Sequence, residues 1–239
     1  MFLTINELCN CRPHPSKSIK ILYKKPKLQI QNVSMKHIAI AGNIGAGKTT
    51  LCELLSKQFS WEVLYEDTST NPYLSDFYYD MPRWAFNLQV YFLNSRFQQI
   101  VEIQKGSKTV IQDRTIYEDA HIFAPNLHEM GLMSKRDFEN YFSLFQIMMS
   151  TIKAPDLLIY LKASIPTLVN HIQLRGRDYE GNISLDYLKK LNQRYEQWIS
   201  EFNKSPVIIV NTDELDFINN QEHLGKIISD VSSQIYGLF

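Results

Sequence analysis

The sequence has few cysteines, no long apolar run and no net charge. Only three of its 239 residues are cysteines, namely Cys9, Cys11 and Cys52. A small odd number argues against a disulfide framework and is typical of a reducing compartment. No run reaches the roughly 18 apolar residues of a membrane span, and the first residues lack the apolar core of a secretory signal. We therefore expect a cytoplasmic protein without a membrane partner, long enough to bury a large core.

The balance of charge hides a difference between two parts of the chain. Residues 1–34 carry six lysines and arginines and one glutamate, whereas residues 35–239 carry 19 basic and 24 acidic residues. The first part has no sustained hydrophobic period, which is typical of a segment without stable structure. We expect an N-terminal extension over 1–34, either a targeting or partner-binding segment or a dispensable one, and a single domain over 35–239. The acidic domain has no basic stripe, so we expect no nucleic-acid partner.

After Met35, short apolar runs alternate with helix-length segments. The predicted strands are 36–41, 62–65, 109–112, 156–161 and 206–210. The predicted helices are about 48–59, 83–105, 115–123, 134–152, 165–174, 184–202 and 220–236. Buried strands separated by helices indicate a parallel sheet covered on both faces, an α/β fold. Pro82 suits a first helical turn, and three serines are expected to cap helices: Ser134, Ser164 and Ser184.

The segment between the first predicted strand and helix matches the pattern G-x-x-x-x-G-K-[ST]. Its residues are Gly42, Asn43, Ile44, Gly45, Ala46, Gly47, Lys48 and Thr49, with Thr50 next. In such a loop the backbone N–H groups surround a polyphosphate at a helix N-terminus. Lys48 would reach the β- and γ-phosphates, and Thr49 would coordinate Mg²⁺. The motif predicts a protein that binds a nucleoside triphosphate.

Other motifs indicate which class of nucleotide-binding protein this is. A switch GTPase should carry an N/T-K-x-D motif, but the nearest candidate, Asn203-Lys204-Ser205, continues with Pro206. A motor or transporter ATPase should have a Walker-B strand, in which four apolar residues are followed by Asp or Glu. Here the strand 109–112 continues into Asp113-Arg114-Thr115, which resembles the D/E-R-S/T element of small P-loop kinases. We therefore expect a phosphotransferase that acts on a small molecule.

A second group of residues is suited to an acceptor substrate. Glu66 follows the second strand at the carboxyl end, where parallel sheets bind ligands, and could accept a hydroxyl proton. Gln89 and Arg96 are seven residues apart on one helical face, with Phe92 between them. Amide and guanidinium groups on an apolar stripe suit a planar heterocycle. Asp119 lies where it could pair with Arg96.

A cationic segment follows the fifth predicted helix, which ends near residue 174. Arg175-Gly176-Arg177, with Glu180 after it, is typical of a helical lid that closes over transferring phosphoryl groups. A solvated run of charges is the alternative interpretation of the same residues.

Five blocks of the sequence, in order, resemble the deoxynucleoside kinase family, particularly its bacterial deoxycytidine, deoxyguanosine and deoxyadenosine kinases. The blocks are IAGNIGAGKTT (40–50), YED (65–67), NPYLSDFYYDMPRWAFNLQVYFLNSR (71–96), QDRTIYEDAHIFA (112–124) and LRGRDYEGNISLDYL (174–188). The resemblance implies a P-loop kinase fold, a five-stranded parallel sheet flanked by helices with an Arg-rich lid. It also implies ATP and Mg²⁺, a deoxyribonucleoside substrate and a homodimer.

The resemblance also implies a role for each matching residue. Catalysis would involve Glu66, Asp113, Arg114 and Lys48, and either Glu66 or Asp113 would take the 5′-hydroxyl proton. Thr49 and Asp113 would hold Mg²⁺. The substrate would be bound by Glu66, Tyr78, Gln89, Arg96, Arg114, Asp119 and Glu180. The phosphate loop, Arg175, Arg177 and the segment from Asp213 to Phe217 would bind ATP.

One position departs from the family pattern. Relatives usually carry arginine one turn before the lid pair, whereas this sequence has His171. This histidine is either a weaker, pH-dependent hydrogen-bond donor to phosphate or a surface residue.

The predicted reaction is ATP-dependent 5′-phosphorylation of a deoxyribonucleoside, with a preference for purines, in nucleotide salvage. Two alternatives stay open: a nucleoside-monophosphate kinase of the thymidylate type, and a non-catalytic homologue that serves as an accessory subunit.

Overall fold

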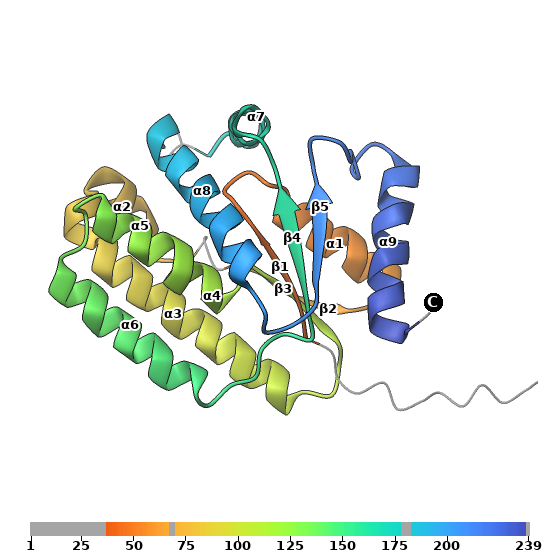
Figure 1. Ribbon diagram of the computed structural model, residues 1–239, viewed down its shortest axis with the longest axis horizontal. Helices are drawn as coiled ribbons and strands as arrows, with labels where there is room; N and C mark the ends of the chain where they lie inside the picture. Colours follow the sequence, from red (N-terminus) through yellow and green to blue (C-terminus); the bar gives the residue numbers. More distant parts are fainter. Residues whose placement is uncertain (1–36, 67–69, 178–182, 238–239) are drawn as a thin grey trace, which may run out of the picture. The chain divides into compact units, whose positions relative to one another are not determined.

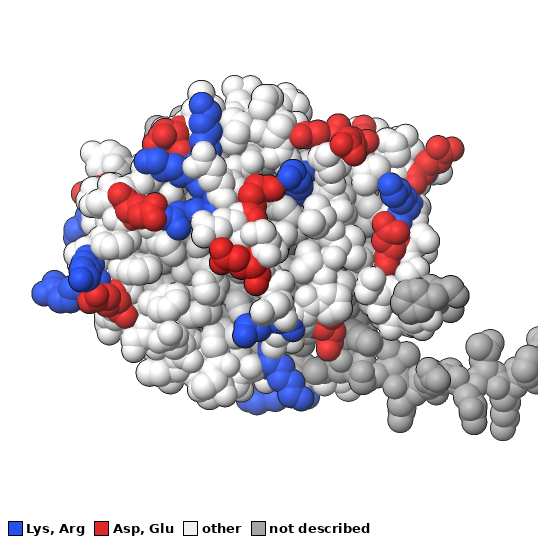
Figure 2. All heavy atoms as spheres, in the orientation of Figure 1, with Lys and Arg blue, Asp and Glu red and all other residues white. Residues whose placement is uncertain are grey.

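The computed structural model describes residues 37–66, 70–177 and 183–237. The expected N-terminal extension over 1–34 and the predicted site residue Glu180 lie outside these ranges. None of the described helices is long and apolar enough to cross a membrane. On the face seen in Figure 2, the described basic and acidic side chains are interspersed.

Five described strands form one parallel sheet with the order β2-β3-β1-β4-β5. Their bounds are β1 (His37–Gly42), β2 (Glu62–Leu64), β3 (Val110–Asp113), β4 (Leu157–Lys162) and β5 (Val207–Asn211). Each bound lies within one residue of the prediction, so the parallel α/β sheet is confirmed. All six residues of β1 are buried, as expected for a central strand covered on both faces.

Helices cover both faces of the sheet. They are α1 (Lys48–Phe59), α2 (Leu74–Tyr79), α3 (Met81–Lys105), α4 (Ile116–Glu118), the π-helix η1 (Asp119–Phe123), α5 (Ala124–Glu129), α6 (Lys135–Met149), α7 (Ile165–Arg175), α8 (Leu185–Glu201) and α9 (Gln221–Tyr236). Helices α1 and α9 lie on one side of the sheet, and α3 and α8 lie on the other (Figure 1).

The register of β1 brings the candidate site residues together. Ile40 of β1 pairs with Asp113 at the end of β3, and Gly42 pairs with Leu161 of β4. The strands are parallel, so the phosphate loop after β1 and the Asp113-Arg114 pair emerge at the same edge of the sheet. The strand order therefore places the two strongest sequence motifs side by side.

The short helix α2 was not predicted, and α3 begins two residues earlier than expected. Only Leu74 and Phe77 of α2 are buried, which is too few to establish a period in the sequence. Asp80 caps α3 by accepting a hydrogen bond from the Arg83 backbone at 3.2 Å. Pro82 lies in the first turn, as predicted.

The predicted end of a helix at residue 123 is wrong. The chain continues from α4 through the π-helix η1 into α5, and Pro125 lies in the first turn of α5. Proline breaks the interior of an ordinary α-helix, but the wider π turn changes the hydrogen-bonding pattern before Pro125. Asp119, a candidate site residue, is the first residue of this π segment.

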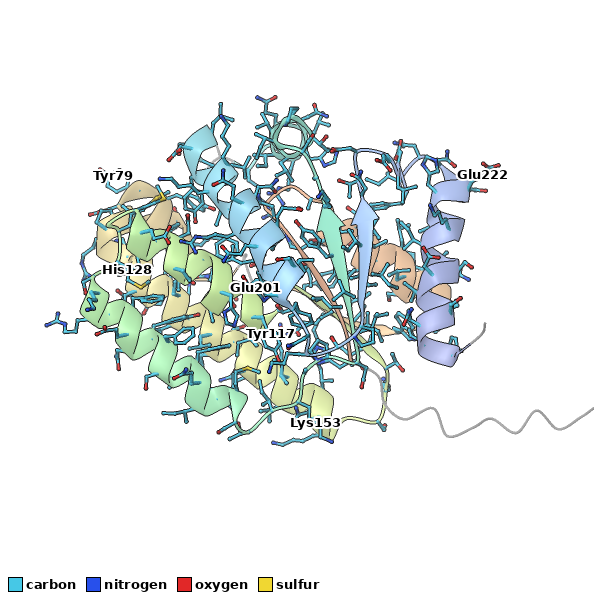
Figure 3. All side chains as sticks on the ribbon, viewed as in Figure 1. Tyr79, Tyr117, His128, Lys153, Glu201 and Glu222 are labelled. Atoms are coloured by element: carbon cyan, nitrogen blue, oxygen red, sulfur yellow. The ribbon has the colours of Figure 1, made fainter. Side chains whose placement is uncertain are left out.

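Aromatic rings pack these helices together. The ring of Tyr117, which is labelled in Figure 3, lies among these helices. Its centroid is 6.4 Å from that of the Phe145 ring and 5.6 Å from that of the Phe202 ring. The His128 ring stacks on Phe138 at 4.9 Å. This packing fixes α4, which immediately follows the Asp113-Arg114 pair.

Two of the three predicted serine caps are confirmed. Ser134 and Ser184 each accept a backbone hydrogen bond at 3.1 Å at the start of α6 and α8. Ser164 makes no such cap. Ser164 occupies the N-cap position of α7, and its backbone N–H donates to the carboxylate of Asp213 at 3.0 Å. Sequence spacing could not reveal this acceptor because it comes from the loop after β5.

Candidate active site

The phosphate loop packs directly against α7. Gly45 and Gly47 have φ values of +84° and +92°, in the left-handed region that favours glycine. A Cβ atom at Gly45 would lie 2.8 Å from the carbonyl oxygen of Leu168, so no larger residue fits. His171 Nδ1 donates to the Gly45 carbonyl at 2.8 Å. This contact gives His171 a defined role in holding the loop against α7.

Lys48 is buried at the base of the loop. Its Nζ donates to the carbonyl oxygens of Gly42 at 2.9 Å and Asn43 at 3.1 Å. Burial, together with the nearby charge of Arg114, lowers the pKa of Lys48 to about 8. The ammonium group is therefore largely charged at neutral pH, as phosphate binding requires.

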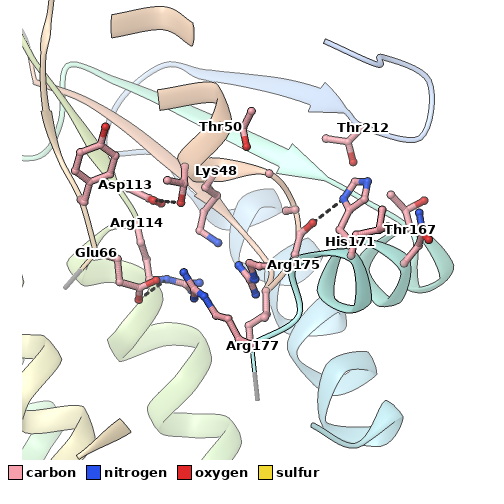
Figure 4. A pocket seen from close by; sticks show the side chains of 18 of the residues that line it. Lys48, Thr50, Glu66, Asp113, Arg114, Thr167, His171, Arg175, Arg177 and Thr212 are labelled. Carbon is pink, nitrogen blue, oxygen red and sulfur yellow. Dashed lines mark hydrogen bonds and ion pairs between the residues drawn. The ribbon is translucent and has the colours of Figure 1, made fainter. Parts of the chain in front are cut away.

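A cavity of about 1080 Å³ joins the phosphate loop to the region around α2 and α3. A site for one small ligand measures about 300–1,000 Å³, so this space suits two substrates. The phosphate-loop lining runs from Ile44 through Thr50. Four cationic side chains extend toward the same space (Figure 4): Lys48, Arg114, Arg175 and Arg177. The arrangement suits a polyphosphate, whereas closure of the predicted lid stays a prediction.

Thr49 and Asp113 meet beside the phosphate loop. Thr49 Oγ1 donates to Asp113 Oδ2 at 2.5 Å, while the buried Oδ1 of Asp113 has no hydrogen-bond partner. Burial raises the pKa of Asp113 above its ordinary value. A hydroxyl oxygen and an unpartnered carboxylate oxygen fit a hard divalent cation such as Mg²⁺. The described residues contain no group of three or more His, Cys, Asp or Glu side chains that could hold a metal ion.

Glu66 lies between two guanidinium groups. Its Oε1 is 2.7 Å from Arg96 Nη2 and 3.0 Å from Arg114 Nε. Burial alone would raise the pKa of Glu66, but the charges of Arg114 and Arg96 outweigh it and lower the pKa to about 2. Glu66 is therefore ionised at neutral pH and faces the cavity as a hydrogen-bond acceptor.

Gln89 and Asp119 line the other end of the cavity. Gln89 is only 3% exposed, and its Oε1 has no hydrogen-bond partner. A buried unpaired amide oxygen costs about 1–3 kcal/mol, so it is well suited to accept from a ligand. Burial raises the pKa of Asp119 to about 6 despite the opposing charge of Arg96. Phe92 and Phe123 supply apolar surface beside these groups.

The predicted ion pair of Arg96 is confirmed, but its place in the site differs from the expectation. Arg96 Nε lies 2.6 Å from Asp119, and the arginine is 2% exposed and not among the cavity-lining residues. The sequence predicts that this guanidinium contacts the substrate. Instead it contacts Asp119 and Glu66 from the side away from the cavity.

Two residues of the phosphate motif also lie behind the cavity wall. Gly42 and Asn43 are not among its lining residues. The Asn43 side chain donates to the Leu188 carbonyl at 3.2 Å and to Asn192 at 3.1 Å, which ties the loop to α8. The remaining described site residues that we predicted all line the cavity, including Tyr78 on α2, Asp213 and Phe217.

Two buried residues in the site were missed in the sequence. Glu118 is fully buried and contacts both Arg114 and the phosphate loop, and Tyr195 on α8 donates to it at 2.7 Å. Thr115 and Glu118 match a capping box, which the structure contains, so the spacing could have singled out Glu118 as a helix cap. No local pattern could have connected it to Tyr195.

Comparisons with known proteins agree with this geometry. Residues 38–236 match the family model described as deoxynucleoside kinase. A deoxyadenosine/deoxycytidine kinase from Bacillus subtilis (strain 168) is 39% identical, covering 83% of this chain and 93% of the relative. A deoxyadenosine kinase from Dictyostelium discoideum is 42% identical, covering 78% and 76%. The solved structure of deoxyadenosine kinase from M. mycoides with bound dATP has a TM-score of 0.75 and 28% identity, covering 83% of this chain and 100% of that one.

Proposed function

The chain belongs to the deoxynucleoside kinase family, and on that premise we propose that it transfers the γ-phosphoryl group of ATP to the 5′-hydroxyl of a deoxyribonucleoside. The observation that carries the proposal is the shared cavity, which has the phosphate loop at one end and the unpartnered amide of Gln89 at the other. Glu66 and Arg114 lie between these ends, where the acceptor hydroxyl would meet the phosphoryl group.

Phosphoryl transfer depends mostly on positioning and on stabilising negative charge. Lys48, Arg114, Arg175 and Arg177 would bind the phosphates, with Arg114 nearest to Glu66. Mg²⁺, when held by Thr49 and Asp113, would neutralise charge on the phosphate oxygens. Its ligands match the oxygen donors that this ion prefers.

We assign the acceptor for the 5′-hydroxyl proton to Glu66. Both carboxylates line the cavity, but Asp113 Oδ2 is engaged by Thr49, and its unpartnered Oδ1 is the oxygen that we assign to Mg²⁺. A pKa near 2 makes Glu66 a weak base, but phosphoryl transfer passes through a loose transition state in which the hydroxyl loses its proton late. Glu66 would therefore mainly orient the hydroxyl and accept its proton as the new bond forms.

We propose a preference for purine deoxynucleosides. Gln89 and Asp119 would bind the edge of the base, and Tyr78 would contact the sugar. The names of the relatives support deoxyadenosine and deoxyguanosine as substrates, with deoxycytidine as a further candidate.

A nucleoside-monophosphate kinase is less well supported. It would need a cation to bind the phosphate of its acceptor. The residues lining the cavity around Gln89 are neutral or acidic, apart from Arg114 at the phosphoryl position. A non-catalytic homologue is also disfavoured, because Lys48, Glu66 and Asp113 are all in place.

A phosphorylation screen of the full chain tests the proposal. Each of four deoxynucleosides is incubated with ATP and Mg²⁺, and monophosphate is quantified, with Lys48→Ala as the inactive control. We expect deoxyadenosine or deoxyguanosine to give the highest kcat/KM. Turnover of pyrimidines alone would contradict the purine preference, and no product with any nucleoside would contradict the function. A chain that starts at Met35 should have the same kcat, since we propose that 35–239 carries the activity.

A further inference from the structure

Glu118 is a fully buried carboxylate that does not line the cavity, yet it contacts three parts of the site. Its Oε1 accepts from the backbone N–H of Gly42, at the start of the phosphate loop, at 3.2 Å. Its Oε2 accepts from the backbone N–H of Thr115 at 2.7 Å. One carboxylate thus joins the loop after β1 to the segment after β3.

The same carboxylate is connected to Arg114 through Tyr195. Arg114 Nη1 donates to the Tyr195 hydroxyl at 2.9 Å, and that hydroxyl donates to Glu118 Oε1 at 2.7 Å. Arg114 Nη1 also lies 3.5 Å from Glu118 Oε1. Tyr195 is fully buried and is not among the cavity-lining residues, so its hydroxyl is committed to this chain of contacts.

The backbone of Arg114 has an unusual conformation, and its side chain is held by contacts with several residues. Its φ is +73°, which costs free energy for a residue with a side chain. Its guanidinium lies 4.6 Å from the centre of the Phe123 ring, and Nε faces Glu66 at 3.0 Å. Such an arrangement persists only where surrounding contacts determine it, and the Glu118–Tyr195 pair supplies these contacts on the side away from the cavity.

We propose that Glu118, acting through Tyr195, is a positioning residue that aims Arg114 at the transferring phosphoryl group and fixes it relative to the phosphate loop. The inference rests on the proposed function, because it assumes that phosphoryl transfer occurs beside Arg114. An arginine at this point stabilises charge mainly in the transition state, so a misdirected guanidinium lowers kcat more than it raises KM.

The test compares two buried tyrosines whose hydroxyls each donate to a glutamate, and only one of these hydroxyls also contacts Arg114. Tyr160 is also buried, stacks on Tyr195 at 5.9 Å and donates to the carboxylate of Glu196 at 2.9 Å. Glu196 is 42% exposed, and among the described residues no hydrogen bond or ion pair joins it to Arg114 or Tyr195. Tyr160→Phe is therefore a matched control for Tyr195→Phe.

For each full-length variant, kcat, both KM values, ATP affinity by calorimetry and the thermal midpoint are measured. We expect Tyr195→Phe to lower kcat by about tenfold or more, because a small misplacement of a catalytic group has large effects on rate. Both KM values and ATP affinity should stay within about twofold of the wild-type values. Tyr160→Phe should retain the wild-type kcat at a similar thermal midpoint.

Glu118→Gln provides a second test. The amide carries no charge, and one of the groups that donate to the Glu118 carboxylate loses its acceptor. Combined with Tyr195→Phe, Glu118→Gln should show losses in kcat that do not multiply, since both changes act through Arg114. If Glu118→Gln does not fold, Tyr195→Phe decides the matter.

Equal kcat values for Tyr195→Phe and Tyr160→Phe would overturn the positioning role. So would a loss of activity in Tyr195→Phe that is fully explained by a smaller fraction of protein able to bind ATP. A wild-type chain that phosphorylates no deoxynucleoside would contradict the proposed function and this inference together, whereas an active wild type with an equally active Tyr195→Phe contradicts the inference alone.

Discussion

Arg114 Nε lies 3.0 Å from Glu66 Oε1, and both residues line the cavity. In the proposed reaction, Arg114 would stabilise the charge of the transferring phosphoryl group, and Glu66 would accept from the attacking hydroxyl. Arg96 supports the pair by contacting Glu66 at 2.7 Å from the buried side. These contacts hold both charged groups together at the cavity wall.

Replacing Glu66 tests its role as proton acceptor. Glu66→Gln keeps the size of the side chain but removes its charge and its capacity to take a proton. We expect kcat to fall by about 10²–10⁴-fold, the usual contribution of a general base, with ATP affinity unchanged by calorimetry. Near-normal turnover would contradict the assignment and transfer the role to Asp113.

Replacing Gln89 tests recognition of the base. Gln89→Leu removes the buried amide while roughly preserving volume, so a bound base would lose its hydrogen-bond partner. We expect kcat/KM for the best deoxynucleoside to fall by at least about 100-fold, because unpaired polar groups are costly in a buried site. Gln98→Leu on the exposed face of the same helix is the matched control and should have little effect. Similar kinetics for the two variants would contradict base recognition by Gln89.

The pKa of Asp119, raised to about 6 by burial, predicts an acid limb in the pH profile. Below this pH the carboxyl group is protonated, so it loses its charge attraction to Arg96, and one of its two acceptor oxygens becomes a donor. The value of kcat/KM for the nucleoside should therefore decrease as pH falls through about 6. Glu66, with a pKa near 2, does not titrate in this range. Asp119→Asn should give a low activity without this limb, and a limb that persists in the variant would contradict the assignment.

Two glycines should respond to alanine in opposite ways. Gly45→Ala forces a left-handed backbone onto a residue whose Cβ would lie 2.8 Å from the Leu168 carbonyl, so it should lower stability and weaken ATP binding. Gly225, in the interior of α9, has no neighbour within 4 Å of an added Cβ. Gly225→Ala should raise the free energy of unfolding by about 0.5–1 kcal/mol. Urea unfolding measures the stability of both variants. A Gly45→Ala variant with the stability of the wild type would contradict the tight packing of the loop on α7.

Local sequence patterns predicted much of this molecule because its strands are short apolar runs and its phosphate loop has fixed spacing. The same patterns could not predict α2, which is too short to be periodic, or the π-helix that carries the chain past Pro125. They also placed Arg96 at the substrate, because spacing identifies the face of a helix but not the buried acids that face it. The contacts of Glu118 with Tyr195 join residues 77 positions apart, so only the folded chain brings them together.

The central claim is that this cavity joins ATP to the 5′-hydroxyl of a deoxynucleoside, and product analysis tests it most directly. Purified full-length protein is incubated with Mg²⁺, ATP and the preferred deoxynucleoside, and the products are identified by phosphorus NMR and mass spectrometry. The account predicts one equivalent of ADP for each equivalent of deoxynucleoside 5′-monophosphate, with both products lost in Lys48→Ala. ADP released without phosphorylated nucleoside, or phosphate attached at the 3′-hydroxyl, would contradict it.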